Sequence, residues 1–142
     1  MIVSGTSHWR GTFRNGKGTI STATTNTLSG VSYTFASRFE GAPGAIPEEL
    51  LAAGHAGCFN HALANISGQN DLTVQSVHTS VELTMGTDDH GPAITGIHVT
   101  TNAKIPGATP QKFQEIAEGA RAWCAFSKAL SVTVTMTATL SS

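Results

Sequence analysis

Apolar and polar residues alternate along three parts of the chain, which is the pattern of strands that bury one face. The alternation is strictest in "SVTVTMTATL", residues 131–140, and it recurs over residues 77–85 and 97–105. The segment between the last two, "GTDDHGP", is rich in turn-forming residues. We therefore expect a hairpin over residues 77–105 and a final strand near the C-terminus.

Shorter strand-like runs occupy the first third of the chain. In "SHWRGTFRNGKGTISTAT" an Asn-Gly pair at positions 15–16 separates two of them, which predicts a hairpin. In "VSYTFASRFE", residues 31–40, the large apolar and aromatic residues share one parity and Arg38 and Glu40 take the other. We expect a third strand here, with Arg38 pointing away from its apolar face.

Two longer segments have a helical pattern. Pro47 is typical of a first helical residue, Glu48 and Glu49 follow where the helix dipole favours acids, and the helix is expected to fade at Gly68. A second helix is expected after the cap-like Thr109, with apolar residues at helical spacing at Phe113, Ile116, Ala117 and Ala120. The resulting order, βββαββααβ, lacks regular βαβ alternation and predicts an α+β fold with largely antiparallel sheets.

The first of these helices is unusually rich in small residues, with alanine or glycine at positions 52, 53, 54, 56 and 57. A glycine inside a helix costs about 1 kcal/mol relative to alanine, so two of them need a reason. Small side chains allow another helix to approach closely, and that helix could come from a second copy of the chain. A homodimer is therefore expected.

Length and charge narrow the class of protein. A chain of 142 residues, with 39% hydrophobic residues and a formal net charge of -1, fits one globular domain over residues 1–142. Its eight Lys and Arg are scattered among nine Asp and Glu, so no basic stripe indicates a nucleic-acid partner. No signal segment or run of about 18 apolar residues predicts a membrane segment, and a cytoplasmic location is expected.

Cys58, inside the first long helix, and Cys124, just beyond the second, are the only cysteines. In a reducing cytosol a structural bridge between them is unusual, so they are either small apolar fillers or reactive thiols. A metal site does not explain them. His55, Cys58 and His61 are spaced so that the two histidines diverge by about 120° around the helix and do not converge on one ion. We expect neither a metal nor another cofactor.

Five segments resemble the OsmC/Ohr family of thiol-dependent peroxidases, specifically its OsmC branch: "SHWRG", "GKGTIST", "SRFEG", "PEELLAAGHAGCF" and "ARAWCAFSKAL". The resemblance spans the chain, the proline-to-cysteine block is its most specific part, and the arginine of "SRFEG" distinguishes the OsmC branch. The chain departs from the family in two places. Ile46 stands where the family usually has Asn, and Ala125 follows Cys124 where the family usually has Pro.

The resemblance implies a function and a set of site residues. Cys58 matches the peroxidatic cysteine, Cys124 the resolving cysteine, Arg38 the arginine that activates the thiol, and Glu48 the carboxylate that holds this arginine. Family members are intertwined homodimers with active sites at the subunit interface. They reduce organic hydroperoxides to alcohols without metal or haem, in oxidative and osmotic stress, and a dithiol linked to the lipoyl system is the expected reductant.

Chemistry explains why these residue types are required. A thiolate attacks a peroxide oxygen and becomes a sulfenic acid, and a second thiol then forms a disulfide that prevents over-oxidation. A free thiol has a pKa of about 8.5 and is mostly protonated at neutral pH. The dipole of its own helix acts only near the first turn, far from Cys58, so Arg38 is the expected activating cation.

Three interpretations stay open at this level. Phe59, Trp123 and Phe126 flank the two thiols and either line an apolar channel for alkyl peroxides or belong to the core. Arg38 with Glu40 could be a solvated strand end. The whole chain could also be a non-catalytic dimeric module that binds a small apolar ligand in the same interface pocket.

Overall fold

The computed structural model describes residues 1–142, and the chain divides into two compact units, residues 1–50 and 51–142. The boundary falls inside helix α2 (Pro47–Gly68), which has the bounds expected from the sequence. None of the helices combines the length and the apolar character needed to cross a membrane.

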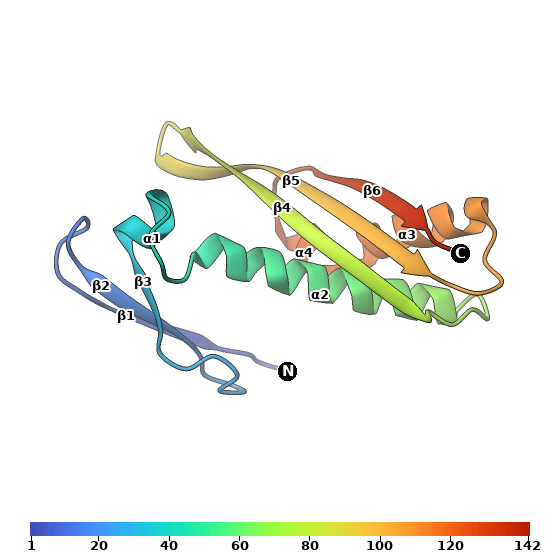
Figure 1. Ribbon diagram of the computed structural model, residues 1–142, viewed down its shortest axis with the longest axis horizontal. Coiled ribbons are helices and arrows are strands. Elements are labelled where there is room, and N and C mark those ends of the chain that lie inside the picture. The colour runs from blue at the N-terminus through green and yellow to red at the C-terminus, as the bar shows by residue number, and fades with distance from the viewer. The chain divides into compact units, whose positions relative to one another are not determined.

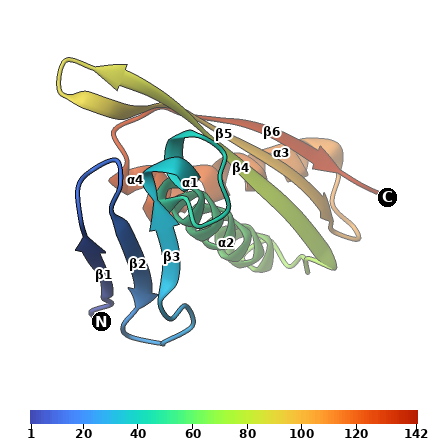
Figure 2. The same cartoon turned by 60° about the vertical axis from the view of Figure 1, so that its left-hand side comes forward.

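The first unit is built on a three-stranded antiparallel sheet in the order β1-β2-β3 (Figure 2). Its strands are β1 (Gly5–Arg10), β2 (Lys17–Thr22) and β3 (Val31–Thr34). The hairpin expected around positions 15–16 is confirmed, and the pair Arg10 and Lys17 closes it. The loop is longer than a two-residue turn: Gly11 adopts a φ of 103°, and the Gly16 N–H donates to the Thr12 carbonyl at 2.7 Å.

The third strand is shorter than the sequence pattern predicted, because residues Phe35–Phe39 form helix α1. A capping box starts this helix. Thr34 Oγ1 accepts from the Ser37 N–H, and Ser37 Oγ accepts from the Thr34 N–H, each at 2.9 Å. The prediction that Arg38 lies on a strand is therefore wrong, and this residue lies in the last turn of α1.

The second unit contains a three-stranded sheet in the order β4-β5-β6, in which β4 and β5 form one long hairpin (Figure 1). Its remaining elements are β4 (Ser76–Asp88), β5 (Gly91–Lys104), α3 (Pro110–Trp123), α4 (Ala125–Ala129) and β6 (Val134–Leu140). Strand β6 pairs parallel with β5, after a crossover through α3 and α4, and all other pairs are antiparallel. The α+β class is confirmed, and α1 is the one helix absent from the expected order.

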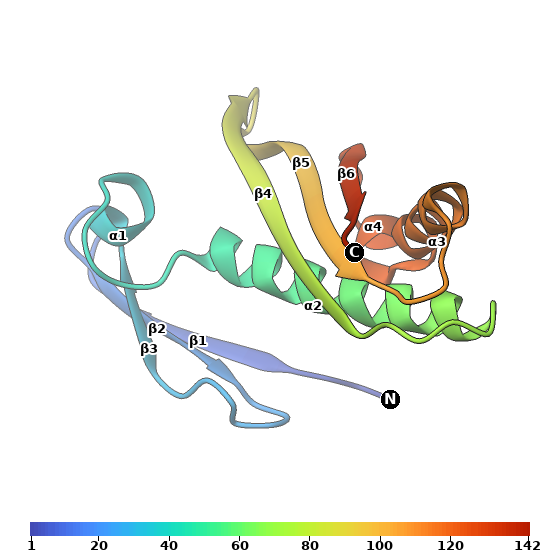
Figure 3. The ribbon, with the colours of Figure 1, turned by 45° about the vertical axis from the view of Figure 1, so that its right-hand side comes forward.

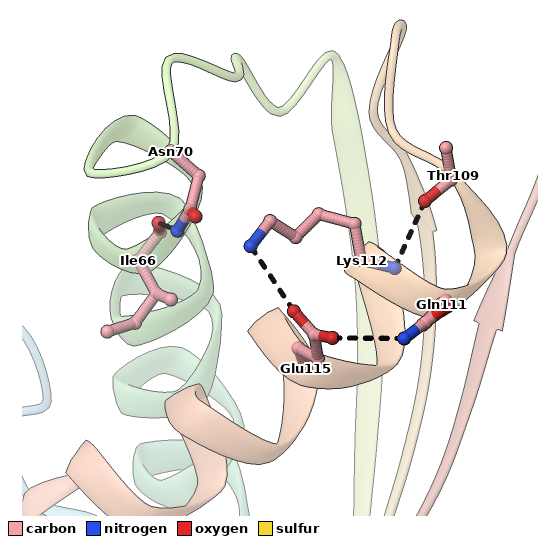
Figure 4. A network of polar contacts seen from close by, with 6 residues as sticks. All are labelled: Ile66, Asn70, Thr109, Gln111, Lys112 and Glu115. Atoms are coloured by element: carbon pink, nitrogen blue, oxygen red, sulfur yellow. Dashed lines mark hydrogen bonds and ion pairs between the residues drawn. The ribbon is translucent and has the colours of Figure 1, made fainter.

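The core of the second unit lies where α2 and α3 run along the sheet (Figure 3). Phe59 and Leu63 of α2, Val99 of β5 and Phe113 of α3 are all fully buried there. Helix α3 begins as expected, with Thr109 Oγ1 accepting from the Lys112 N–H at 3.2 Å (Figure 4). These helices fix the two positions at which the cysteines lie.

Candidate active site

The two cysteines come together in the second unit. Cys58 is a half-buried residue of α2, and Cys124 is a fully buried residue that links α3 to α4. Both are free thiols, and each affects the pKa of the other. The fold thus brings together two thiols that are separated by 66 positions in the sequence.

The two thiols differ in acidity. Burial on its own raises the pKa of Cys58, but hydrogen bonds from the Cys124 thiol and from the N–H groups of Phe126 and Ala125, together with the charge of Lys128, bring this pKa below its ordinary value. Burial is the main reason that the pKa of Cys124 is raised, and the neighbouring Cys58 raises it further. Cys58 therefore ionises first and is the better nucleophile at neutral pH.

The start of α4 contributes to this difference in a way that sequence reasoning missed. The N-terminus of α2 lies far from Cys58, as expected, but the N–H groups of Phe126 and Ala125 at the start of α4 lower the pKa of Cys58, and Lys128 adds a positive charge. No pattern in the sequence brings α4 to the middle of α2. The one available signal was a lysine four residues after Cys124, on the helix that this cysteine precedes.

His55 holds α4 against α2. It is fully buried, its Nε2 lies 3.1 Å from Ser127 Oγ, and its ring stacks on Phe126 with centroids 5.7 Å apart. Burial lowers the pKa of His55, so the imidazole is neutral at neutral pH. Gly54 permits the close packing, since a Cβ there would lie 3.0 Å from the Phe126 ring. In the sequence His55 is a candidate metal ligand only, whereas its contacts in the structure position the start of α4.

The three aromatic residues that flank the thiols have different surroundings. Phe59 is fully buried among the core residues of the second unit. Of the two interpretations, an apolar channel or the core, its burial agrees with the core. Phe126 packs on His55, and Trp123 is 51% exposed at the end of α3. Of the three, Phe126 is the one whose backbone N–H lowers the pKa of Cys58.

The other two predicted site residues meet in the first unit. Arg38 Nε donates to both carboxylate oxygens of Glu48, at 3.0 and 3.2 Å, and Arg38 Nη2 also donates to Glu48. The hydrogen bond to Arg38 lowers the pKa of Glu48, and the same bond raises the pKa of Arg38. The guanidinium also lies over the Phe39 ring, 5.0 Å from its centroid. Its orientation is thus fixed from two sides.

Residues 40–138 match the protein family described as "OsmC-like protein". The chain belongs to this family. It is 37% identical over 132 residues to "Peroxiredoxin OsmC" of Escherichia coli K12, a match that covers 93% of this chain and 92% of that relative. It is also 34% identical over 91 residues to "Organic hydroperoxide resistance protein OhrB" of Bacillus subtilis, covering 63% and 65% of the two chains.

The OsmC-like fold is also found by comparison with solved structures. The crystal structure of OhrB from Bacillus subtilis superposes with a TM-score of 0.71 at 24% sequence identity, over 97% of this chain and 98% of that one. The resemblance to the OsmC/Ohr family seen in the sequence is confirmed.

Proposed function

We propose that this OsmC-like protein is a thiol-dependent peroxidase that reduces organic hydroperoxides to alcohols, with Cys58 as the peroxidatic and Cys124 as the resolving cysteine. The observation that carries the proposal is the pair of neighbouring free thiols, in which the pKa of Cys58 is lowered and that of Cys124 is raised. The names of the relatives, a peroxiredoxin and organic hydroperoxide resistance proteins, agree with this chemistry.

The reaction proceeds in two steps on these sulfurs. The Cys58 thiolate attacks the terminal oxygen of the hydroperoxide, the O–O bond breaks, and the departing alkoxide takes a proton to become the alcohol. Cys58 is left as a sulfenic acid. Cys124 then attacks this sulfur, a disulfide forms and water leaves. A dithiol reductant, which we propose is linked to the lipoyl system, restores both thiols in the reducing cytoplasm.

Arg38 and Glu48 complete the proposed site. Arg38 has five N–H groups, of which its bonds to Glu48 engage two, leaving three for a thiolate and a peroxide. Glu48 and Cys58 lie ten positions apart on α2, a rise of about 15 Å along a continuous helix. We therefore propose a homodimer in which Glu48 and Arg38 of one protomer serve Cys58 of its partner, with the small residues of α2 allowing close approach.

Anaerobic thiol titration with a stoichiometric alkyl hydroperoxide tests the function. The peroxidase loses two thiols per chain quickly, whereas a binding module on the same fold loses neither. Cys58→Ser abolishes peroxide reduction, and Cys124→Ser undergoes one oxidation and then stalls with an oxidised Cys58. Normal turnover of Cys124→Ser with a dithiol reductant would show that Cys124 is not the resolving residue.

A further inference from the structure

A hydrophilic cleft lies on one face of the β1-β2-β3 sheet. It has a volume of about 460 Å³, and the side chains that line it are all polar or charged: His8, Arg10, Asn15, Lys17, Thr19 and Ser32. Gly18 completes the lining with its backbone. Sites for small molecules have volumes of about 300–1,000 Å³ and are mostly apolar, so the size of this cleft suits a small molecule and its polar lining restricts which one.

The strand register places the side chains of the cleft in two rows across the sheet. In the first row His8 pairs with Thr19, which in turn pairs with Ser32. In the second row, two residues further along β1, Arg10 pairs with Lys17. Because side chains two positions apart on a strand point to the same face, both rows lie on one face of the sheet.

The aromatic residues of these strands occupy the other face. Trp9 and Tyr33 pair with Gly18 from its two sides, and a Cβ at Gly18 would lie 2.7 Å from the Trp9 ring and 2.4 Å from the Tyr33 ring. Both rings therefore cover this glycine from the far side of the sheet. The face with the cleft offers a ligand charge and hydrogen bonds, but no ring on which to stack.

The charge of the cleft is positive and unpaired. Residues 1–39 contain no Asp or Glu, and neither Arg10 nor Lys17 takes part in an ion pair. Directly opposite residues of antiparallel strands have Cβ atoms about 4.5–5.5 Å apart, so these two like charges repel each other and lower the stability of the hairpin. An anion bound by both side chains would replace this repulsion with two attractions, which gives the unfavourable pair a function.

The hydrogen-bonding groups of the cleft are also free. None of the six side chains has a partner within the chain, since the bond at Asn15 runs from its backbone N–H to Thr12 Oγ1 at 3.2 Å. The planar fork of Arg10 fits two oxygens of a phosphate, and Lys17 adds a point charge. The amide of Asn15 and the nearby Thr and Ser hydroxyls each donate and accept, as binding to the hydroxyl groups of a ligand requires.

We propose that this cleft binds a small organic phosphate with a hydrophilic body, such as the phosphate ester of a sugar or polyol. Arg10 and Lys17 bind the phosphate, and Asn15, Thr19 and Ser32 bond to hydroxyl groups of the body. Two adjacent cations favour a phosphate ester, which carries a charge of about −1.5 to −2 at neutral pH, over a monocarboxylate. A nucleotide base or an acyl chain would find no apolar wall here. The cleft contains no cysteine, so this proposal is independent of the peroxidase function.

Calorimetry at constant ionic strength tests the site, because salt screens exposed charges. Glucose 6-phosphate and glycerol 3-phosphate are the probes, and each should bind at one equivalent per chain. Glucose, which lacks the phosphate, and acetate, which has a single charge, should bind at least about tenfold more weakly. Inorganic phosphate, which lacks the hydroxyl-bearing body, should bind at least about threefold more weakly than the esters.

Three variants locate the binding. Lys17→Gln removes one cation of the cleft and should weaken binding of both esters about tenfold. Arg14→Gln removes the same charge from the loop of the same hairpin, outside the cleft, and should change binding less than about twofold. Lys17→Glu places an acid opposite Arg10 and should abolish binding while making the hairpin more stable. Loss of binding in a more stable protein is not caused by unfolding.

The proposal is overturned if neither ester binds the parent protein, as when a second copy covers this face of the sheet. Equal weakening by Lys17→Gln and Arg14→Gln also overturns it, because net charge rather than the cleft would then attract the anion. Inorganic phosphate that binds as tightly as the esters would reject the proposed class of ligand. Cys58→Ser protein should bind both esters like the parent, so the result does not depend on peroxide reduction.

Discussion

At the scale of single residues, Ala125 contributes a group that the usual family residue at this position lacks. Its backbone N–H helps to lower the pKa of Cys58, whereas proline has no N–H. Ala125→Pro should raise the pKa of Cys58 and slow its oxidation by peroxide at neutral pH a few-fold. Proline fits the first position of a helix, so the fold should be retained.

Alkylation rates of Cys58 measured against pH check this prediction. Ala125→Gly, which keeps the N–H, is the matched control and should keep the pKa of the parent protein. The same pH profile for the proline and glycine variants would show that this N–H does not stabilise the thiolate.

His55 predicts a dependence of stability on pH. Burial holds the pKa of His55 below its ordinary value of 6.5, so the unfolded chain binds a proton more readily than the folded one. The free energy of unfolding should therefore fall as pH falls below about 6.5, with a slope from this residue of at most about 1.4 kcal/mol per pH unit.

Denaturant unfolding between pH 7 and 5 measures the slope. His55→Gln cannot titrate but can still bond to Ser127, and it should reduce the slope. His61→Gln, an exposed substitution on the same helix, is the control for loss of an imidazole. A slope that His55→Gln leaves unchanged would contradict the prediction.

At the scale of elements, the sequence predicts the helices whose first residues are typical of a helix start. Helices α2 and α3 begin at Pro47 and Pro110 as expected, because a proline marks each start and Thr109 caps the second. The strand prediction for residues 35–39 is wrong because Phe35 and Phe39, four residues apart, share a face in a strand and in a helix alike. The Thr34 and Ser37 pair was the signal that favoured the helix.

The candidate site likewise combines groups that carry a sequence signal with groups that do not. Cys58, Cys124, Arg38 and Glu48 are recognisable from the sequence. Each lies in a short segment that resembles the family, such as "SRFEG" or "PEELLAAGHAGCF". The N–H groups that face Cys58 are not recognisable, because every residue has one and only the packing of α4 on α2 selects those of Ala125 and Phe126.

The β1–β2 hairpin carries an unfavourable charge pair. Arg10 and Lys17 lie directly opposite each other, and residues 1–39 contain no Asp or Glu to separate their charges. Like charges at such positions destabilise a sheet, so Lys17→Glu should raise the free energy of unfolding by about 0.2–1 kcal/mol.

Thermal unfolding at low and high salt checks this. Lys17→Gln removes the repulsion without adding attraction and should give an intermediate stability at low salt. High salt should reduce the differences among the three proteins. If Lys17→Glu were no more stable than Lys17→Gln at low salt, the cross-strand charge pair would not be what limits this hairpin.

At the scale of the whole molecule, the proposed catalytic residues form two pairs that belong to different units. Arg38 bonds to Glu48 in the first unit, and the free thiols of Cys58 and Cys124 are neighbours in the second. Helix α2 carries one member of each pair, Glu48 near its start and Cys58 in its middle. A homodimer in which each protomer supplies one pair to each site satisfies both arrangements with a single two-fold axis.

Complementation between inactive chains tests this arrangement. Cys58→Ser and Glu48→Ala chains are each expected to be inactive, but a mixed dimer has one site with intact Cys58 and intact Glu48. Co-refolding equal amounts should restore about a quarter of the parent activity, since about half of the dimers are mixed and each has one complete site of two. Co-refolding Cys58→Ser with Cys124→Ser is the matched control. Because both cysteines of a pair lie in the same unit of one chain, that mixture should stay inactive. Mixed dimers of the first pair that are confirmed by mass yet remain inactive would show that Glu48 serves its own chain.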